Sequence, residues 1–111
     1  MSTILVTGAA GLLGRHVVRD LLAHGHAVRG LDRRSAEEAI DWYVGDVTDP
    51  DLVTTAVAGV DAVFHIAAVP NIWSGDGRTI MRVNLLGTHL VFEAAEAAGV
   101  GRMVFCSSDS V

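Results

Sequence analysis

The fold of this chain is decided by residues 6–14, which read VTGAAGLLG. A short apolar run over residues 4–7 leads into the glycines and predicts a buried strand, and an apolar pattern with helical spacing follows them. Gly8 allows a tight turn off the strand, Gly11 lets the main chain approach a phosphate, and Gly14 lets the helix pack near the sheet. Because a helix N-terminus offers free N–H groups and a positive dipole end, the stretch predicts a pyrophosphate-binding turn.

Strand and helix patterns alternate along the rest of the chain. Further strands are predicted over residues 27–31, 42–44, 62–66 and 103–106, and residues 33–39 are predicted to form a loop or a short helical turn. Asp49 followed by Pro50 predicts a helix cap and start, with Gly59 as the end, and a long helix is predicted over residues 78–98. The helix after the first glycines should end at Gly25 and carry one broad apolar face. The members of that face are Leu13, Val17, Val18, Leu21 and Leu22.

This alternation predicts a single α/β domain over residues 1–111, with a parallel sheet covered on both faces. Five strands connected in this way give the order 3-2-1-4-5 of a Rossmann-type doubly wound sheet. The pattern stops at the fifth strand. We therefore expect a Rossmann domain that is truncated after that strand, with no substrate domain.

The composition argues against several classes of protein. The formal net charge is −5, and 8 Lys and Arg residues provide no basic stripe for nucleic acid. The chain has neither the ~20 uninterrupted apolar residues of a membrane span nor the basic segment of a signal peptide. The single cysteine, Cys106, has no disulfide partner in the chain, which favours the cytoplasm. The five histidines lack the accompanying ligands of a metal site.

Asp32 ends the second predicted strand, about 20 residues after the glycines, where a carboxylate can accept both hydroxyls of an adenosine ribose. With this acid in place, the chain resembles the extended short-chain dehydrogenases/reductases of the NAD-dependent epimerase/dehydratase kind. The resemblance covers essentially all of the chain. Its motifs are Thr-Gly-x-x-Gly-x-x-Gly at residues 7–14, Gly45-Asp46-Val47, His65-Ile66-Ala67-Ala68, Asn84-Leu85-Leu86-Gly87-Thr88 and Ser107-Ser108.

The resemblance implies an NAD(P)-dependent enzyme that transfers a hydride to or from a sugar nucleotide or a similar hydroxyl or carbonyl substrate. It implies that Ser108 orients the substrate, and that the long helix takes part in a homodimer contact. The family's Tyr-x-x-x-Lys pair does not occur within residues 1–111, so we expect the chain alone to be inactive. The residues implied to hold the cofactor are Gly8, Gly11, Leu12, Leu13, Gly14, Asp32, Arg33, Asp46, Val47, Ile66, Ala67, Ala68 and Asn84.

Several interpretations stay open at this point. Asp32 favours NAD over NADP because a carboxylate repels a 2′-phosphate, although Arg33 could pair with that phosphate. Asp46 could flank the adenine or simply cap a strand end, and His65 could contact the cofactor or be a packed, hydrogen-bonded histidine. Two functions compete with the enzyme: a non-enzymatic NAD(P)-binding redox sensor, and an inert truncated fragment.

Overall fold

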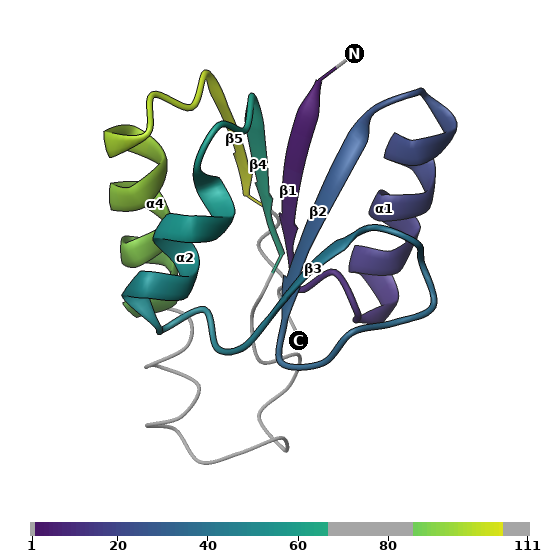
Figure 1. The fold of residues 1–111 in the computed structure, drawn as a ribbon, viewed down its shortest axis with the longest axis horizontal. Coiled ribbons are helices and arrows are strands. Elements are labelled where there is room, and N and C mark those ends of the chain that lie inside the picture. Colours follow the sequence, from purple (N-terminus) through teal and green to yellow (C-terminus); the bar gives the residue numbers. More distant parts are fainter. Residues whose placement is uncertain (1, 67–85, 106–111) are drawn as a thin grey trace.

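A computed structural model describes residues 2–66 and 86–105, which form a layered α/β structure (Figure 1). Its sheet has five strands in the order β3-β2-β1-β4-β5, and each neighbouring pair is parallel. The predicted Rossmann-type sheet and its strand order are therefore confirmed. The strands are β1 (Thr3–Thr7), β2 (Ala27–Asp32), β3 (Asp41–Val44), β4 (Ala62–His65) and β5 (Arg102–Phe105).

Helices cover both faces of the sheet, as Figure 1 shows. Helix α1 (Leu12–Ala23) lies on one face, where it packs on β1 and β2. Helices α2 (Pro50–Val57) and α4 (Thr88–Ala97) lie side by side on the other face. This arrangement follows from the right-handed crossovers that connect parallel strands.

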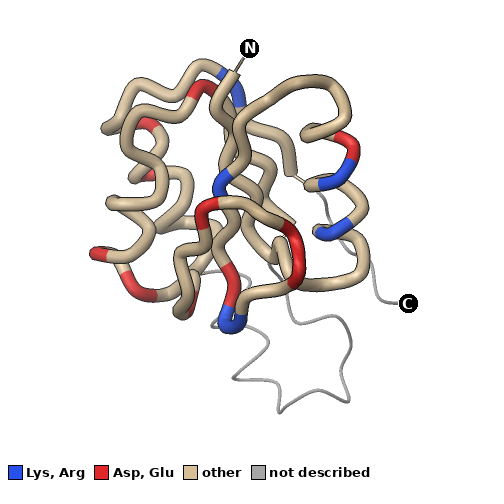
Figure 2. Tube along the Cα trace, turned by 45° about the vertical axis from the view of Figure 1, so that its right-hand side comes forward, with Lys and Arg blue, Asp and Glu red and all other residues tan. Residues whose placement is uncertain are grey.

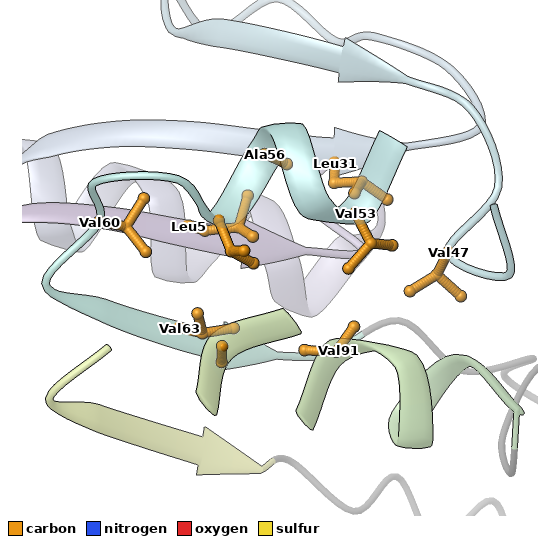
Figure 3. Close-up of a cluster of buried hydrophobic side chains, with 10 residues drawn as sticks. Leu5, Leu31, Val47, Val53, Ala56, Val60, Val63 and Val91 are labelled. Carbon is orange, nitrogen blue, oxygen red and sulfur yellow. The ribbon is translucent and has the colours of Figure 1, made fainter. Parts of the chain in front are cut away.

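Both faces of the strands are buried because successive residues alternate between two hydrophobic clusters. Figure 3 shows the cluster beneath α2 and α4, in which Leu5 and Val63 of the sheet meet Val53 and Val91 of the helices. Full burial of a side chain of this size contributes about 1.5–3 kcal/mol to folding. The buried members of the second cluster, beneath α1, are Ile4, Val6, Ala9, Val18, Val28 and Ala62.

Local signals set the helix ends as predicted. The Asp49 carboxylate caps α2 by accepting hydrogen bonds from the main-chain N–H groups of Asp51 at 3.1 Å and Leu52 at 3.4 Å. Pro50 occupies the first helical position, where its missing N–H costs nothing. Gly25 follows α1 with φ of 84°, a conformation that L residues rarely adopt, so the helix ends there.

The structure corrects one predicted face and several predicted boundaries. The apolar face of α1 is narrower than predicted, since Leu13 is 48% exposed and Leu22 is 38% exposed, while Val18 is buried. The reason is that α1 packs mainly on β1 and β2, and a narrow stripe of apolar side chains is enough to cover these two strands. The fourth strand ends at His65, one residue before its predicted end. Residues 33–39 form a loop, which is the first of the two alternatives predicted for them. Of the helix predicted over residues 78–98, residues 78–85 lie outside the described part of the chain.

Figure 2 shows acidic and basic positions interspersed along the chain. Within residues 2–66 and 86–105, no helix combines the length and the apolar character that a membrane crossing requires. The same residues contain no group of three or more His, Cys, Asp or Glu side chains that could hold a metal ion.

Candidate functional site

The candidate site lies at the edge of the sheet where the parallel strands have their carboxyl ends. From β1 the chain continues to β2 and β3 on one side, whereas β4 and β5 lie on the other side. Ligands of open α/β sheets bind at such a switch in strand order. The turn of residues 8–11 leaves β1 at this position and leads directly into α1.

Two of the three glycines are required by the geometry of the turn itself. Gly8 has φ of 71°, and its N–H donates a hydrogen bond to the carbonyl oxygen of Leu31 at 2.8 Å. A Cβ atom on Gly14 would overlap the carbonyl group of Gly8, so only glycine lets α1 approach the turn this closely. The turn off the strand and the close helix packing that the sequence predicts are both present.

Gly11 differs from the other two glycines, because the protein's own packing leaves room for a side chain there. Among residues 2–66 and 86–105, a Cβ atom on Gly11 would meet only the carbonyl oxygen of Gly8, at an ordinary contact distance of 3.5 Å. Gly11 is the N-cap residue of α1 and has no side chain with which to cap the helix. Leu12 is 84% exposed just beyond it. The beginning of α1 therefore presents main-chain N–H groups at an accessible surface, which suits an anion.

The carboxylate of Asp32 lies against the glycine turn. Its Oδ2 atom accepts a hydrogen bond from the N–H of Ala10 at 2.9 Å, and its Oδ1 atom accepts one from the N–H of Arg33 at 2.7 Å. Each carboxylate oxygen can accept more than one hydrogen bond. Asp32 therefore holds the turn in place and retains acceptor capacity for a ligand hydroxyl.

The residues after β3 have more of a structural role than the resemblance implies. The Oδ1 atom of Asp46 accepts hydrogen bonds from the N–H of Thr48 at 2.9 Å and from its hydroxyl at 2.8 Å, which closes a tight turn. An exposed ion pair at 3.3 Å joins Asp46 to Arg33. Val47 is only 5% exposed and belongs to the core beneath α4. An adenine contact at Val47 would therefore use its main chain.

His65 is the centre of a buried polar network that joins three elements. Its Nδ1 atom lies 2.8 Å from the hydroxyl oxygen of Thr7 at the end of β1, and its Nε2 atom lies 3.1 Å from the hydroxyl oxygen of Thr88 at the start of α4. The N–H of Ile66 donates to the same Thr7 hydroxyl at 2.9 Å. Burial lowers the pKa of His65 to about 4. The histidine is hydrogen-bonded and neutral at pH 7, which is the second of the two roles considered for it.

Part of the predicted site is not described by the structure. Ala67, Ala68, Asn84 and Ser108 lie outside residues 2–66 and 86–105. The described part brings together the glycine turn, Asp32 and the residues that follow β3 and β4. The sequence analysis did not find the partners of His65. The only signals for them were Thr7 as the last residue of β1 and Thr88 as the first residue of α4.

Several proteins are similar in sequence to the whole or nearly the whole of this chain. A 3 beta-hydroxysteroid dehydrogenase/Delta 5-->4-isomerase from Mycobacterium tuberculosis is 38% identical over 121 aligned residues, covering 100% of this chain and 33% of the relative. The chain thus spans about a third of that protein. A solved short-chain dehydrogenase/reductase superfamily protein from Agrobacterium tumefaciens with bound NAD is 41% identical with a TM-score of 0.88, covering 95% of this chain and 32% of the other. MoeE5 in complex with UDP-glucose and NAD is 35% identical with a TM-score of 0.87, covering 98% and 37%.

The family assignment follows from the extent of the match. The model of the NAD dependent epimerase/dehydratase family matches residues 4–111, which is nearly the whole chain. The matched residues include most of β1, the glycine turn, Asp32 and the network around His65. This chain therefore belongs to the NAD-dependent epimerase/dehydratase family, as its motifs indicate.

Proposed function

We propose that this chain holds NAD in an oxidoreductase that transfers a hydride between C4 of the nicotinamide and a hydroxyl- or carbonyl-bearing carbon of the substrate. The observation that carries the proposal is the start of α1, where a Cβ atom would fit at Gly11 and the carboxylate of Asp32 accepts a hydrogen bond from the neighbouring Ala10. NAD supplies the hydride acceptor when it is bound. The residues of this chain bind and orient it.

The glycine turn supports the placement of the pyrophosphate. The packing of the described residues leaves room for a Cβ atom at position 11, so the missing Cβ there would serve the approach of a ligand. The N–H groups of Leu12, Leu13 and Gly14 belong to the first turn of α1, where intrahelical acceptors are lacking. These groups and the helix dipole attract a diphosphate.

Asp32 supports NAD as the cofactor. Its carboxylate lies beside the turn and has acceptor capacity left for the adenosine ribose hydroxyls. A phosphate in the place of the 2′-hydroxyl would meet this negative charge. The solved relatives from Agrobacterium tumefaciens and MoeE5 hold NAD, which supports the same choice.

The substrate class and the remaining residues are part of the proposal. MoeE5 holds UDP-glucose, which supports a sugar nucleotide or a similar hydroxyl-bearing molecule as the substrate. We propose that Ala67, Ala68 and Asn84 line the cofactor cleft and that Ser108 orients the substrate. The homodimer and the cytoplasmic location stay predictions.

The proposal is tested by titrating the protein with NAD and comparing it with the Gly11→Ala variant. The added methyl group fits the protein but occupies the place of the diphosphate. Overpacking typically costs about 1–3 kcal/mol, so the Kd for NAD should rise by roughly 5- to 150-fold while the melting temperature stays unchanged.

Gly101→Ala is the matched control for this titration. Within the described part of the chain, a Cβ atom there would meet only the carbonyl oxygen of Asp61 at 3.7 Å, and Gly101 precedes β5 at the opposite edge of the sheet. This variant should bind NAD as the unaltered protein does. An affinity that is equal in all three proteins, or an unaltered protein that binds no NAD, would refute the proposed function.

A further inference from the structure

The carboxylate of Glu38 ties the loop between β2 and β3 to two arginines of helix α1. The Glu38 side chain is 8% exposed. It accepts hydrogen bonds from Nε of Arg15 at 3.1 Å, from Nη2 of Arg15 at 3.4 Å and from Nε of Arg19 at 2.9 Å. The hydrogen bond from Arg15 is the main reason why the pKa of Glu38 is lowered. Glu38 thus engages both arginines of the first two turns of α1.

The main chain and the neighbours of Glu38 fix the same loop. The carbonyl oxygen of Glu38 accepts a hydrogen bond from Nε1 of Trp42 at 3.0 Å. The side chains of Trp42, Ile40 and Ala9 pack so closely over Gly30 that a Cβ atom there would lie 2.8–2.9 Å from each of them. Since Ala9 belongs to the glycine turn and Ile40 to the loop that carries Glu38, the loop and the turn meet over Gly30. Figure 2 shows the basic positions on α1 and the acidic positions on the loop beside it.

The loop that carries Glu38 and the carboxylate of Asp32 both adjoin the glycine turn, Asp32 through the hydrogen bond that it accepts from the N–H of Ala10. NADP differs from NAD by a 2′-phosphate on the adenosine ribose. Asp32 is proposed to bind the hydroxyls of that ribose. Arg15 is four residues after Gly11, a rise of about 6 Å along α1. A guanidinium group is the preferred partner of a phosphate, since it forms two parallel charge-assisted hydrogen bonds. Arg15 and Arg19 are therefore potential ligands of a 2′-phosphate that Glu38 already occupies.

We propose that Glu38 determines cofactor specificity: by engaging Arg15 and Arg19, it withholds both guanidinium groups from a 2′-phosphate and favours NAD over NADP. This inference rests on the proposed function. Glu38 touches neither cofactor, and it acts as a positioning residue through the two arginines. Its effect adds to the repulsion that Asp32 exerts on the same phosphate.

The test compares the Kd values for NAD and NADP in the unaltered protein, in Glu38→Gln and in Glu37→Gln. Glu38→Gln keeps the shape and one acceptor oxygen but loses the charge, so the affinity ratio should shift toward NADP by roughly tenfold, the effect of one charge-assisted hydrogen bond. Glu37→Gln changes the net charge equally. The Glu37 side chain is 88% exposed, and its 3.7 Å ion pair with Arg15 is longer than a hydrogen bond, so the ratio of the NAD and NADP affinities should stay nearly constant. Adding Arg15→Gln and Arg19→Gln to Glu38→Gln should restore the original ratio.

The outcomes separate the two levels of the proposal. NAD binding with an unchanged ratio in folded Glu38→Gln, or equal shifts in the two glutamate variants, would overturn the role of Glu38 alone. A variant that keeps Glu38 and carries Arg15→Gln and Arg19→Gln gives a test that does not depend on the folding of Glu38→Gln. It should keep the original ratio, and a selective loss of NADP affinity would show that the arginines already serve the phosphate. Absence of NAD binding by the unaltered protein would refute the proposed function itself.

Discussion

The buried histidine makes the stability of this protein depend on pH in a defined direction. His65 is 5% exposed, and its pKa in the folded protein is about 4, below the unperturbed value of about 6.5 in the unfolded chain. Both states are neutral above about pH 6.5, so the full stability is present there. As the pH falls toward about 4, the unfolded chain takes up a proton that the folded protein does not, and stability is lost.

The expected magnitude follows from the two pKa values. A shift of one pKa unit corresponds to 1.36 kcal/mol, so the whole loss amounts to about 3 kcal/mol once the pH lies below both pKa values. About 2 kcal/mol of it should be lost between about pH 7.5 and about pH 5. This is a large part of the 5–15 kcal/mol that stabilises a typical domain.

The assay is urea denaturation at a series of pH values, with the unaltered protein beside His65→Gln. Glutamine can hydrogen-bond with Thr7 and Thr88 but does not titrate. Over the same pH interval, the free energy of unfolding of His65→Gln should therefore fall by about 2 kcal/mol less than that of the unaltered protein. His16→Gln removes an exposed histidine of α1 and is the control for the loss of a histidine as such. Equal pH dependence in His65→Gln and the unaltered protein would refute the argument that His65 is buried in its neutral form.

Three further predictions concern the glycine turn, a helix cap and the cofactor carboxylate. Gly14→Ala should lower the free energy of unfolding by at least about 2 kcal/mol, because its Cβ overlaps the carbonyl group of Gly8; a thermal melt equal to that of the unaltered protein would contradict this. Asp49→Ala should cost about 1 kcal/mol in urea denaturation, since the two N–H groups at the start of α2 lose their acceptor; no loss would mean that water replaces the cap. Asp32→Ala should weaken NAD more than NADP in a titration, and equal losses would remove the reason to assign NAD specificity to this carboxylate.

Much of the fold could be predicted from the sequence because its signals are local. The glycine spacing of residues 8–14 sets the turn and the helix approach, and the Asp49–Pro50 pair sets the start of α2. Alternating strand and helix patterns then leave few topologies, since parallel connections are right-handed. These features depend on neighbours within a few residues, which is why the sheet order was predicted correctly.

The side-chain partners within the site could not be predicted in the same way. Thr7 and His65 are 58 positions apart, and Glu38 is 23 positions from Arg15. No local periodicity records such pairs. Val47 was expected at the adenine, and only the packing of α4 against the sheet shows that its side chain is in the core.

The sequence by itself determined the strand order, the glycine turn and the family's motifs, because each depends on residue type and spacing along the chain. The tertiary structure decided that His65 is neutral, that a Cβ atom would fit at Gly11 but not at Gly14, and that Glu38 holds two arginines. Burial and hydrogen bonding depend on which surfaces the folded sheet and helices bring together. Those contacts exist only once distant segments have packed.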